Sequence, residues 1–275
     1  MDKLIITVAP VGAEISKEDH PYLPITPEEI ALEVHKSREA GASICHLHVR
    51  DKNGQPTQKA ERFNEVIQTI KEKVPDIIIQ VSTGGAVGMT EEERMEPLSL
   101  SPEMATLTTG TVNFGEGVFY NPPSFIKKLA TYMSEKGITP EIEVFETGFI
   151  QNALQLVNQN ILSLPLHFDF VLGVPGGMPA NFKNLFFLSE QLPSGCTWTV
   201  AGIGRWEYPL AILSIMMGGN VRVGFEDNLF LKKGLKATSN AELIERVVNF
   251  SRSIGREVAT PDEARQMLHI KGKNK

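Results

Sequence analysis

Residues 219–228 read GNVRVGFEDN, and the alternation in this stretch decides between two folds. In an extended strand successive side chains point to opposite faces, so Val221 and Val223 share one face while Arg222 and Glu226 share the other. A parallel strand within an open sheet is covered on both faces and should be apolar on both. A barrel strand can point polar side chains into the lumen, so the stretch favours a closed barrel.

The same one-sided polarity recurs in other strand-like runs, such as the ones that carry Thr106 and Glu143. Helical segments separate these runs, and strands that alternate with helices form parallel sheets. We therefore predict an α/β fold, a (β/α)8 TIM barrel that forms a single domain over residues 1–275, with an open doubly wound sheet as the rival. The predicted strands are 4–9, 43–49, 77–81, 104–108, 142–145, 168–172, 197–201 and 220–225.

Helix signals occupy the gaps between the predicted strands. Capping boxes, in which a Ser or Thr precedes a Glu by three residues, begin at Thr26, Thr90 and Ser239. A further helix is predicted from Asn121 to near Gly137, where the glycine ends it. The remaining helical segments are 61–73, 150–162, 181–190 and 207–217.

Composition excludes several function classes. The net charge of −6 argues against a nucleic-acid partner, which requires a basic surface. The chain lacks a GxGxxG motif after its first strand and lacks a P-loop lysine, which disfavours nicotinamide and ATP chemistry. The N-terminal run is neither a signal peptide nor a membrane span, so we predict a soluble cytoplasmic protein with no membrane partner. The basic tail 269–275 is predicted to fray.

Residues 42–50, ASICHLHVR, place two histidines on one strand face. His46 and His48 are two residues apart, so both imidazoles point the same way and can bind one zinc ion. A catalytic zinc site usually needs a third protein ligand, and Glu226 is the best candidate because the last strand closes the barrel near these histidines. The alternatives are a hydrogen-bonded histidine pair without metal, and an ion pair between Glu226 and Arg222.

Two further groups near the same strand end have alternative roles. Asp227 follows Glu226 directly and is either a general base beside the metal or a cap for the next turn. Arg222 would be costly to bury in a barrel without an anion, so it must serve Glu226, Asp227 or an anionic substrate.

Polar groups follow other strands as well. Backbone N–H groups and hydroxyls in residues 82–85, STGG, can form an anion-binding nest, although a glycine turn is most often only a tight loop. Glu14 and Glu143 are acidic groups directed at the same barrel end, and two carboxylates suit an ammonium group on a substrate. A solvated loop position is the alternative for Glu14.

Taken together, these motifs resemble the β-keto acid cleavage enzymes over nearly the whole chain. The segments that carry the resemblance are 46–51 HLHVRD, 80–85 QVSTGG, 143–148 EVFETG, 202–205 GIGR, 221–228 VRVGFEDN and 255–261 GREVATP. The resemblance implies a zinc-binding (β/α)8 barrel, often a homotetramer. It implies an acyltransferase reaction in which a β-keto acid condenses with the co-substrate acetyl-CoA, and the adduct is cleaved to acetoacetate and a new acyl-CoA.

Site residues carry over from the family by position. The implied zinc ligands are His46, His48 and Glu226; the implied base is Asp227, with Arg222 beside it; the implied carboxylate contacts are Ser82, Gly85 and Thr106; and the implied pocket acids are Glu14, for a substrate amine, and Glu143. An amine contact at Glu14 favours 5-amino-3-oxohexanoate as substrate, 3-aminobutanoyl-CoA as product and a place in lysine degradation by fermentation.

Three other functions remain open from the sequence. One is a cleavage enzyme for a different β-keto acid. Another is a different zinc barrel, either a lyase such as a class II aldolase or a hydrolase. The last is a non-catalytic ligand-binding barrel in which the two histidines are hydrogen-bonded core residues.

Overall fold

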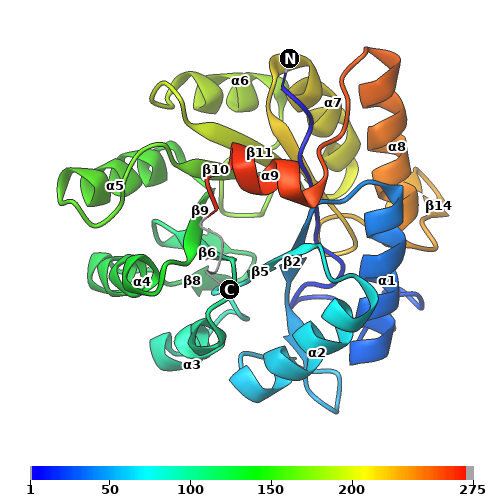
Figure 1. The fold of residues 1–275 in the computed structure, drawn as a ribbon, viewed down its shortest axis with the longest axis horizontal. Helices are drawn as coiled ribbons and strands as arrows, with labels where there is room; N and C mark the ends of the chain where they lie inside the picture. Colours follow the sequence, from blue (N-terminus) through cyan, green and yellow to red (C-terminus); the bar gives the residue numbers. More distant parts are fainter. Residues whose placement is uncertain (1, 271–275) are drawn as a thin grey trace.

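Eight parallel strands close into a barrel in the computed structural model, which describes residues 2–270 (Figure 1). The order around the barrel is β1-β12-β11-β10-β9-β6-β5-β2, and β1 closes it by pairing with both β12 and β2. This closure confirms the predicted barrel and excludes the open sheet. The strands are β1 (Ile6–Val8), β2 (Ile44–Leu47), β5 (Ile78–Val81), β6 (Met104–Thr108), β9 (Thr139–Val144), β10 (His167–Leu172), β11 (Thr197–Gly202) and β12 (Asn220–Val223).

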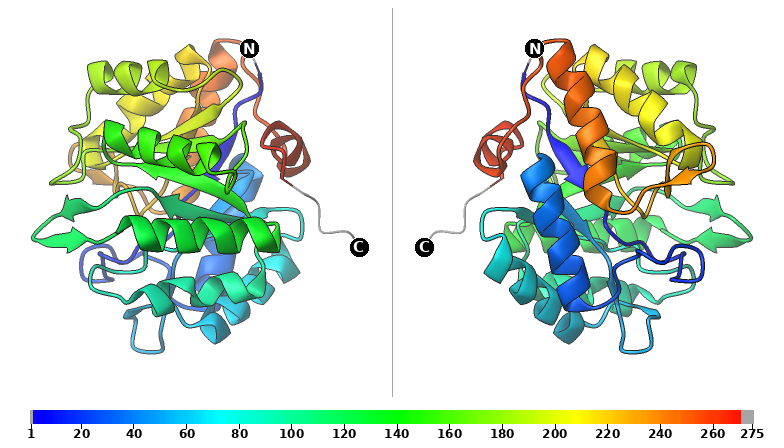
Figure 2. Two further views of the ribbon diagram at one scale, coloured as in Figure 1. Left: turned by 90° about the vertical axis from the view of Figure 1, so that its left-hand side faces the viewer. Right: turned by 90° about the vertical axis from the view of Figure 1, so that its right-hand side faces the viewer.

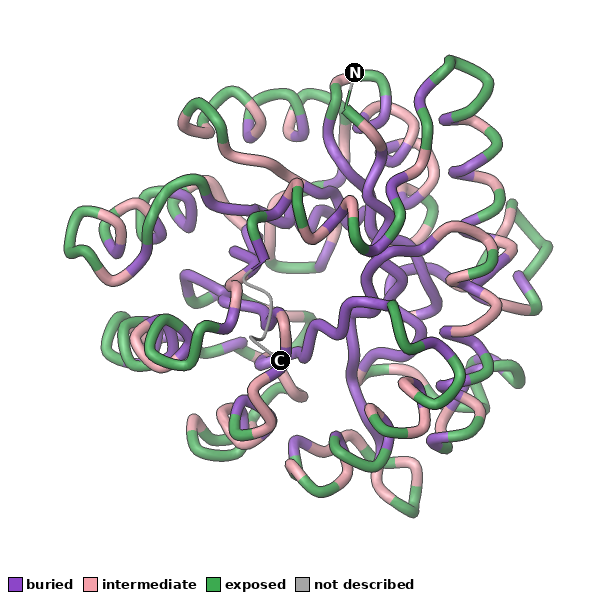
Figure 3. The backbone as a smooth tube through the Cα atoms, viewed as in Figure 1, coloured by how far each residue is buried: buried purple, intermediate pink, exposed green. Residues whose placement is uncertain are grey.

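Strand register aligns the polar residues inside the barrel. His46 lies opposite Gln80 on the neighbouring strand, and Glu143 lies opposite Asp169. All four side chains are buried, whereas the helices expose much of their outer surface (Figure 3). A polar group without solvent needs a partner: His46 hydrogen-bonds to Gln80, Glu143 accepts from Thr108, and Asp169 lies 3.6 Å from Arg222. The alternation seen in the sequence therefore corresponds to a polar interior surrounded by an apolar layer.

Helices surround the barrel and pack on its outer face (Figures 1 and 3). The capping boxes predicted at Thr26 and Thr90 are present. The box predicted at Ser239 is wrong: its side chain caps nothing, and the Glu242 carboxylate instead accepts from the backbone and hydroxyl of Thr238. The helices are α1 (Pro27–Ala40), α2 (Ala60–Lys73), α3 (Glu91–Met95), α4 (Pro123–Lys136), α5 (Thr147–Asn158), α6 (Phe182–Glu190), α7 (Glu207–Met217), α8 (Asn240–Ser253) and α9 (Pro261–Met267), with 3-10 turns η1 (Glu96–Leu100) and η2 (Gly204–Trp206).

Helix α9 was not predicted, and it covers the N-terminal end of the barrel (Figure 1). It begins with a capping box formed by Thr260 and Glu263. Ala264 and the following Leu268 and Ile270 pack on the first residues of the barrel strands, including Ile44. Ile270 is buried, so the described chain is ordered two residues beyond the start of the predicted fraying. The rest of that tail, 271–275, lies outside the described residues.

Three small antiparallel hairpins follow barrel strands at the opposite, C-terminal end. They were not predicted from the sequence. They are β3–β4 (Val49–Arg50 and Pro56–Thr57), β7–β8 (Val112–Phe114 and Gly117–Phe119) and β13–β14 (Phe230–Lys232 and Leu235–Lys236). The β7–β8 hairpin projects away from the barrel on the side opposite α9 (Figure 2). In a barrel of this kind, side chains and loops at the C-terminal end form the functional site.

Two remaining features concern the cysteines and the length of the helices. Both cysteines are free thiols; Cys45 is buried and Cys196 is partly buried. Within residues 2–270, no helix combines the length and the apolar character needed to cross a membrane.

Candidate active site

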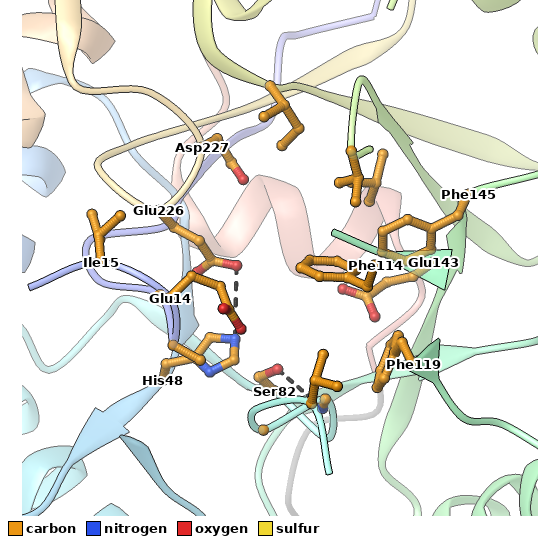
Figure 4. Close-up of a pocket in the computed structure, with 18 of the residues that line it drawn as sticks. Glu14, Ile15, His48, Ser82, Phe114, Phe119, Glu143, Phe145, Glu226 and Asp227 are labelled. Atoms are coloured by element: carbon orange, nitrogen blue, oxygen red, sulfur yellow. Dashed lines mark hydrogen bonds and ion pairs between the residues drawn. The ribbon is translucent and has the colours of Figure 1, made fainter. Parts of the chain in front are cut away.

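A cavity of about 240 Å³ opens at the C-terminal end of the barrel. Its polar wall comes from Glu143 within β9, Arg222 within β12 and residues that follow β1, β2, β5 and β12, and its apolar wall contains Phe114, Phe119 and Phe145 (Figure 4). Most of the predicted site residues line this cavity: Glu14, His48, Ser82, Gly85, Glu143, Arg222, Glu226 and Asp227. The charged and polar side chains of the lining are therefore predicted site residues, whereas the apolar wall was not predicted from the sequence.

Two predicted site residues do not line the cavity. His46 is fully buried behind it, with its Nε2 atom 3.5 Å from Oε1 of Glu226. Thr106 is also fully buried, and its hydroxyl oxygen accepts a hydrogen bond from the backbone of Thr83 at 3.0 Å. In this structure, Thr106 supports the turn at residues 82–85 from behind.

A sharp bend after β12 places Glu226 and Asp227 at the cavity. Gly224 has a φ of +153°, and a Cβ atom built on it would lie 2.2 Å from the carbonyl oxygen of Ala9, so only glycine fits here. Its backbone N–H donates to the buried carboxylate of Glu207 at 3.0 Å. The bend turns the chain out of the strand, so the two acidic residues that follow face the barrel axis.

His46, His48 and Glu226 form a cluster with the geometry of a metal site. One ligand atom from each lies within 4.8 Å of the others. Nε2 of His46 and Oε2 of Glu226 are buried and have no hydrogen-bond partner within residues 2–270. Two imidazole nitrogens and one carboxylate oxygen are a zinc donor set, and unsatisfied buried acceptors are the groups a cation would satisfy. The residues present therefore fit a zinc ion.

Electrostatics in this cluster also favour a bound cation. Burial lowers the pKa of His48 to about 4, so its imidazole is neutral at pH 7 and available as a ligand. Burial and Arg222 would lower the pKa of His46 as well, but Glu226 and Glu143 together outweigh them and raise that pKa, so these carboxylates attract a positive charge, a proton or a metal ion, at this ring. Glu226 is held ionised because Arg222 and the two histidines outweigh its burial and lower its pKa.

Gln80, on β5, determines which nitrogen of His46 faces the cluster. Its Oε1 atom lies 2.7 Å from Nδ1 of His46. A side-chain carbonyl oxygen only accepts, so Nδ1 carries the proton and Nε2 is directed at Glu226 with its lone pair free. No role was predicted for Gln80 from the sequence. The available indication was that a polar residue alternates with apolar ones in this barrel strand.

Arg222 binds both acidic residues that follow the Gly224 bend. Its guanidinium donates two hydrogen bonds of 2.9 Å to the carboxylate of Asp227 and one to Glu226. Glu143 and Asp169 lie on its other side, at 3.7 and 3.6 Å. Of the alternatives left open, the ion pair with Glu226 is therefore present. Within residues 2–270 the carboxylate of Asp227 bonds only to Arg222, so it does not cap the next turn.

Asp227 has the properties of a general base. Burial raises its pKa to about 6, with Arg222 opposing the rise and Glu226 adding to it. A base is most effective when its pKa is near the working pH, and Asp227 is mostly ionised at pH 7. It lies in the cavity beside the cluster of His48 and Glu226, as Figure 4 shows.

The loop after β1 carries Glu14 across the mouth of the cavity. Arg50 holds this loop by donating to the carbonyl oxygens of Gly12 and Ile15, the latter at 2.7 Å. A Cβ atom at Gly12 would lie 2.6 Å from Cγ of Glu226, so the loop packs directly on the cluster of His46, His48 and Glu226. Glu14 itself is exposed and lines the cavity, a position from which its carboxylate can contact a substrate.

Comparison with known proteins agrees with this geometry. A family model described as beta-keto acid cleavage enzyme matches residues 3–270. The chain is 55% identical to the 3-keto-5-aminohexanoate cleavage enzyme of Fusobacterium nucleatum subsp. nucleatum, over 98% of this chain and 99% of that protein. It is 49% identical to the protein of the same name from Acetoanaerobium sticklandii, with the same coverage.

Two more distant similarities concern the co-substrate and the fold. The 3-oxoadipate:acetyl-CoA acetyltransferase of Cupriavidus necator is 40% identical, over 97% of this chain and 94% of that protein. The structure described as the ternary complex of ObcA with C4-CoA adduct and oxalate superimposes with a TM-score of 0.77 at 22% identity, over 90% of this chain and 68% of that one. At that identity, the superposition supports the barrel fold alone.

Proposed function

Because the chain belongs to the β-keto acid cleavage enzyme family, we propose that it is a zinc-dependent enzyme that cleaves 5-amino-3-oxohexanoate with acetyl-CoA. The enzyme class is an acetyl-CoA-dependent acyltransferase that cleaves a C–C bond. One observation carries the proposal most strongly: the His46, His48 and Glu226 cluster and the Arg222-bound carboxylate of Asp227 share one cavity.

The residues of the cavity account for each step of such a reaction. A zinc ion held by the cluster would act as a Lewis acid toward the 3-keto group and acidify the neighbouring CH2. Asp227 takes a proton from that carbon, C2, and Arg222 keeps its carboxylate in place. C2 then forms a bond to the thioester carbonyl carbon of acetyl-CoA, and the CoA thiolate leaves.

Cleavage uses the same groups in a reaction that runs like the reverse of the condensation, with Asp227 now donating the proton. The CoA thiolate adds to C3 of the adduct, the C2–C3 bond breaks, and C2 takes the proton back from Asp227. The products are acetoacetate and 3-aminobutanoyl-CoA, so atoms and electrons balance without a redox cofactor. Neither step requires a covalent intermediate on the protein.

The substrate proposal rests on the hydrogen-bond donors and the carboxylates that line the cavity. The Ser82 hydroxyl and the backbone N–H groups of the 82–85 turn suit the carboxylate of the keto acid, with Gly85 beside them. Glu14 and Glu143 offer carboxylates for an ammonium group. Thr106 contributes by supporting the turn. Placement in lysine fermentation follows from this substrate and is part of the proposal.

We also propose a homotetramer located in the cytoplasm, where acetyl-CoA is available. Helix α6 exposes Phe182, Phe186 and Phe187, and Met216 of α7 is 59% exposed. Helices α6 and α7 contact each other, and clustered large apolar residues at a surface are typical of subunit interfaces. Light scattering of the purified protein should give four times the chain mass of 30.4 kDa; a monomer would contradict the proposed assembly.

The function is tested by assaying purified protein with acetyl-CoA and a panel of β-keto acids. We expect acetoacetate formation to be fastest with 5-amino-3-oxohexanoate and to require acetyl-CoA. A preference for another keto acid would change the substrate but keep the reaction. Turnover without acetyl-CoA would favour the aldolase or hydrolase alternative, and no turnover of any keto acid would favour a ligand-binding barrel.

A further inference from the structure

Arg94, on the short helix α3, is a buried cation without a carboxylate partner. Its side chain is 3% exposed, and no carboxylate oxygen of residues 2–270 lies within 4.0 Å of its guanidinium. The guanidinium packs against the rings of Phe119 and Phe125, at 4.6 and 4.7 Å from their centroids. Burial lowers its pKa to about 10, so it stays charged at pH 7. A buried charge of this kind is costly unless an anion compensates it.

The guanidinium lies directly behind the turn at residues 82–85. Its Nε–H donates to the carbonyl oxygen of Thr83 at 2.7 Å. Its other nitrogens donate to the carbonyl oxygen of Tyr120 at 2.9 Å and to Oδ1 of Asn121 at 2.6 Å. The turn lines the cavity on its other side, as does Phe119. One layer of protein therefore separates the unpaired charge from the cavity.

A chain of hydrogen bonds runs from Arg94 toward the cavity, and each group in it donates to the next. The Thr83 carbonyl that accepts from Arg94 belongs to the same peptide unit as the N–H of Gly84. That N–H donates to Oγ of Ser82 at 3.2 Å, and Ser82 lines the cavity. Hydrogen bonds aligned in series polarise one another, so the guanidinium makes the Ser82 hydroxyl a stronger donor. Within residues 2–270, Oγ of Ser82 acts only as an acceptor, which leaves its proton free for a ligand.

The cavity is rich in negative charge, so a substrate carboxylate needs a strong hydrogen-bond donor in order to bind there. Four carboxylates line it, from Glu14, Glu143, Glu226 and Asp227. Arg222, the one arginine in the lining, already binds Asp227 and Glu226. Even with the two positive charges of a zinc ion on the cluster and the one of Arg222, the four carboxylates leave one negative charge in excess, which would repel the carboxylate of a β-keto acid. Among the described residues that line the cavity, those of the 82–85 turn combine hydrogen-bond donors with a positive charge behind them, the guanidinium of Arg94.

We propose that Arg94 is a positioning residue that supplies the positive charge for binding the substrate carboxylate, acting through the Thr83–Gly84 peptide and the Ser82 hydroxyl. The inference rests on the proposed function and extends it, because it names a residue outside the cavity that determines recognition of the acid group. Arg94 does not touch the substrate, and its removal leaves the zinc ligands and Asp227 in place.

The test compares acetoacetate with its methyl ester, which lacks the negative charge and carries one more methyl group, by calorimetry on the zinc-loaded protein. Arg94→Gln should weaken acetoacetate about tenfold and the ester less than about twofold, because a charge-assisted interaction is lost for one ligand only. KM for the keto acid should rise, and zinc content should not change. An equal loss for both ligands would show a purely structural role and overturn the proposal.

Two further variants distinguish the loss of the Arg94 charge from a general loss of folding and test the route through Ser82. Arg94→Lys keeps the charge, so it should retain most of the acetoacetate affinity; equal weakening of both ligands would again overturn the proposal. In a Ser82→Ala background, Arg94→Gln should weaken acetoacetate clearly less than in wild type, and an undiminished effect would contradict the route through Ser82. If wild type turns over no β-keto acid, the proposed function fails; if wild type is active, these results test Arg94 alone.

Discussion

The Nδ1 atom of His46 lies 2.7 Å from Oε1 of Gln80, and this contact orients the imidazole so that its other nitrogen faces Glu226. The two residues come from neighbouring strands, where they are register partners in the β2–β5 ladder. The hydrogen bond directs Nε2 toward Glu226, at 3.5 Å from its Oε1 atom. Gln80, which lies outside the cluster of His46, His48 and Glu226, therefore sets the orientation of the His46 ring within that cluster.

Removal of this contact should weaken zinc binding. Gln80→Met is close in shape but cannot accept a hydrogen bond, and we expect the zinc dissociation constant to rise about 10- to 100-fold. Competition with a chromophoric chelator measures the constant. Gln80→Glu keeps the acceptor and is the matched control, expected near wild type. Wild-type affinity in Gln80→Met would show that the contact does not orient His46.

The ligand set is tested by Glu226→Gln and His46→Ala. Each removes one of three zinc ligands, so zinc content and activity should fall together. Atomic emission on protein purified with limiting zinc gives the stoichiometry. Glu143→Gln is the control, because Glu143 lines the same cavity but lies outside the cluster and should keep its zinc. One tightly held zinc per chain in Glu226→Gln would exclude Glu226 as a ligand.

Asp227→Asn separates the base from the metal. The amide keeps the size of the side chain but accepts protons poorly, so zinc should remain while turnover falls about 10²- to 10⁴-fold. Exchange of the C2 protons of the keto acid with D2O, followed by NMR without acetyl-CoA, monitors this step alone. Exchange at the wild-type rate would mean that another group takes the proton.

Glu14→Gln tests the contact to the substrate amine. Loss of a charge-assisted hydrogen bond should lower kcat/KM for 5-amino-3-oxohexanoate about tenfold and leave a neutral analogue such as 3-oxohexanoate nearly unchanged. Steady-state kinetics on both substrates provide the comparison. A similar loss for the two would indicate that Glu14 positions the loop that packs on Glu226 instead of binding the amine.

A pH-dependent effect on stability is expected at the N-terminal end of the barrel. The Lys3 ammonium and the Thr260 backbone N–H lower the pKa of Glu263 to about 2. A carboxyl group whose pKa falls on folding stabilises the protein above its unfolded value, near 4.5, and loses that contribution as the pH drops toward 2. Urea unfolding should show Glu263→Gln less stable than wild type at pH 7, with the difference shrinking below pH 4.5.

Glu257→Gln is the control for this effect. Glu257 also contacts Lys3, at 3.2 Å, but it is largely exposed and caps no helix. Its substitution should change stability less at pH 7 than that of Glu263. A difference between Glu263→Gln and wild type that is constant from pH 7 to pH 3 would exclude ionisation of Glu263 as its source.

Local pattern in the sequence was enough to predict the barrel and several polar residues of its cavity, whereas the apolar wall with Phe114, Phe119 and Phe145 was not predicted. All eight strands could be located because polar residues such as Arg222 alternate with buried valines, and that alternation distinguishes a lumen from a covered sheet. Glu226 could be assigned to the site because barrel closure brings the last strand beside the first. These inferences need only the alternation of polar and apolar residues and the order of the strands in the chain.

The features that could not be predicted depend on contacts between residues that are far apart in the sequence. The Glu207 carboxylate that accepts from Gly224, and the Arg94 guanidinium behind Thr83, are joined to their partners by folding and not by spacing. At Ser239 the pattern of a capping box was present, but Glu242 bonds to Thr238 instead. Helix α9 carried a readable signal at Thr260, which matches the box at Thr26, but its seven residues are too few for clear periodicity.

Isotope tracing tests the central claim most directly. Wild-type protein is incubated with 5-amino-3-oxohexanoate and acetyl-CoA that carries ¹³C in both acetyl carbons, and the products are analysed by NMR. Attack of C2 on the acetyl thioester places both labels in C3 and C4 of acetoacetate, while the 3-aminobutanoyl-CoA stays unlabelled. Label in the new acyl-CoA, or unlabelled acetoacetate formed at the same rate without acetyl-CoA, would contradict the account.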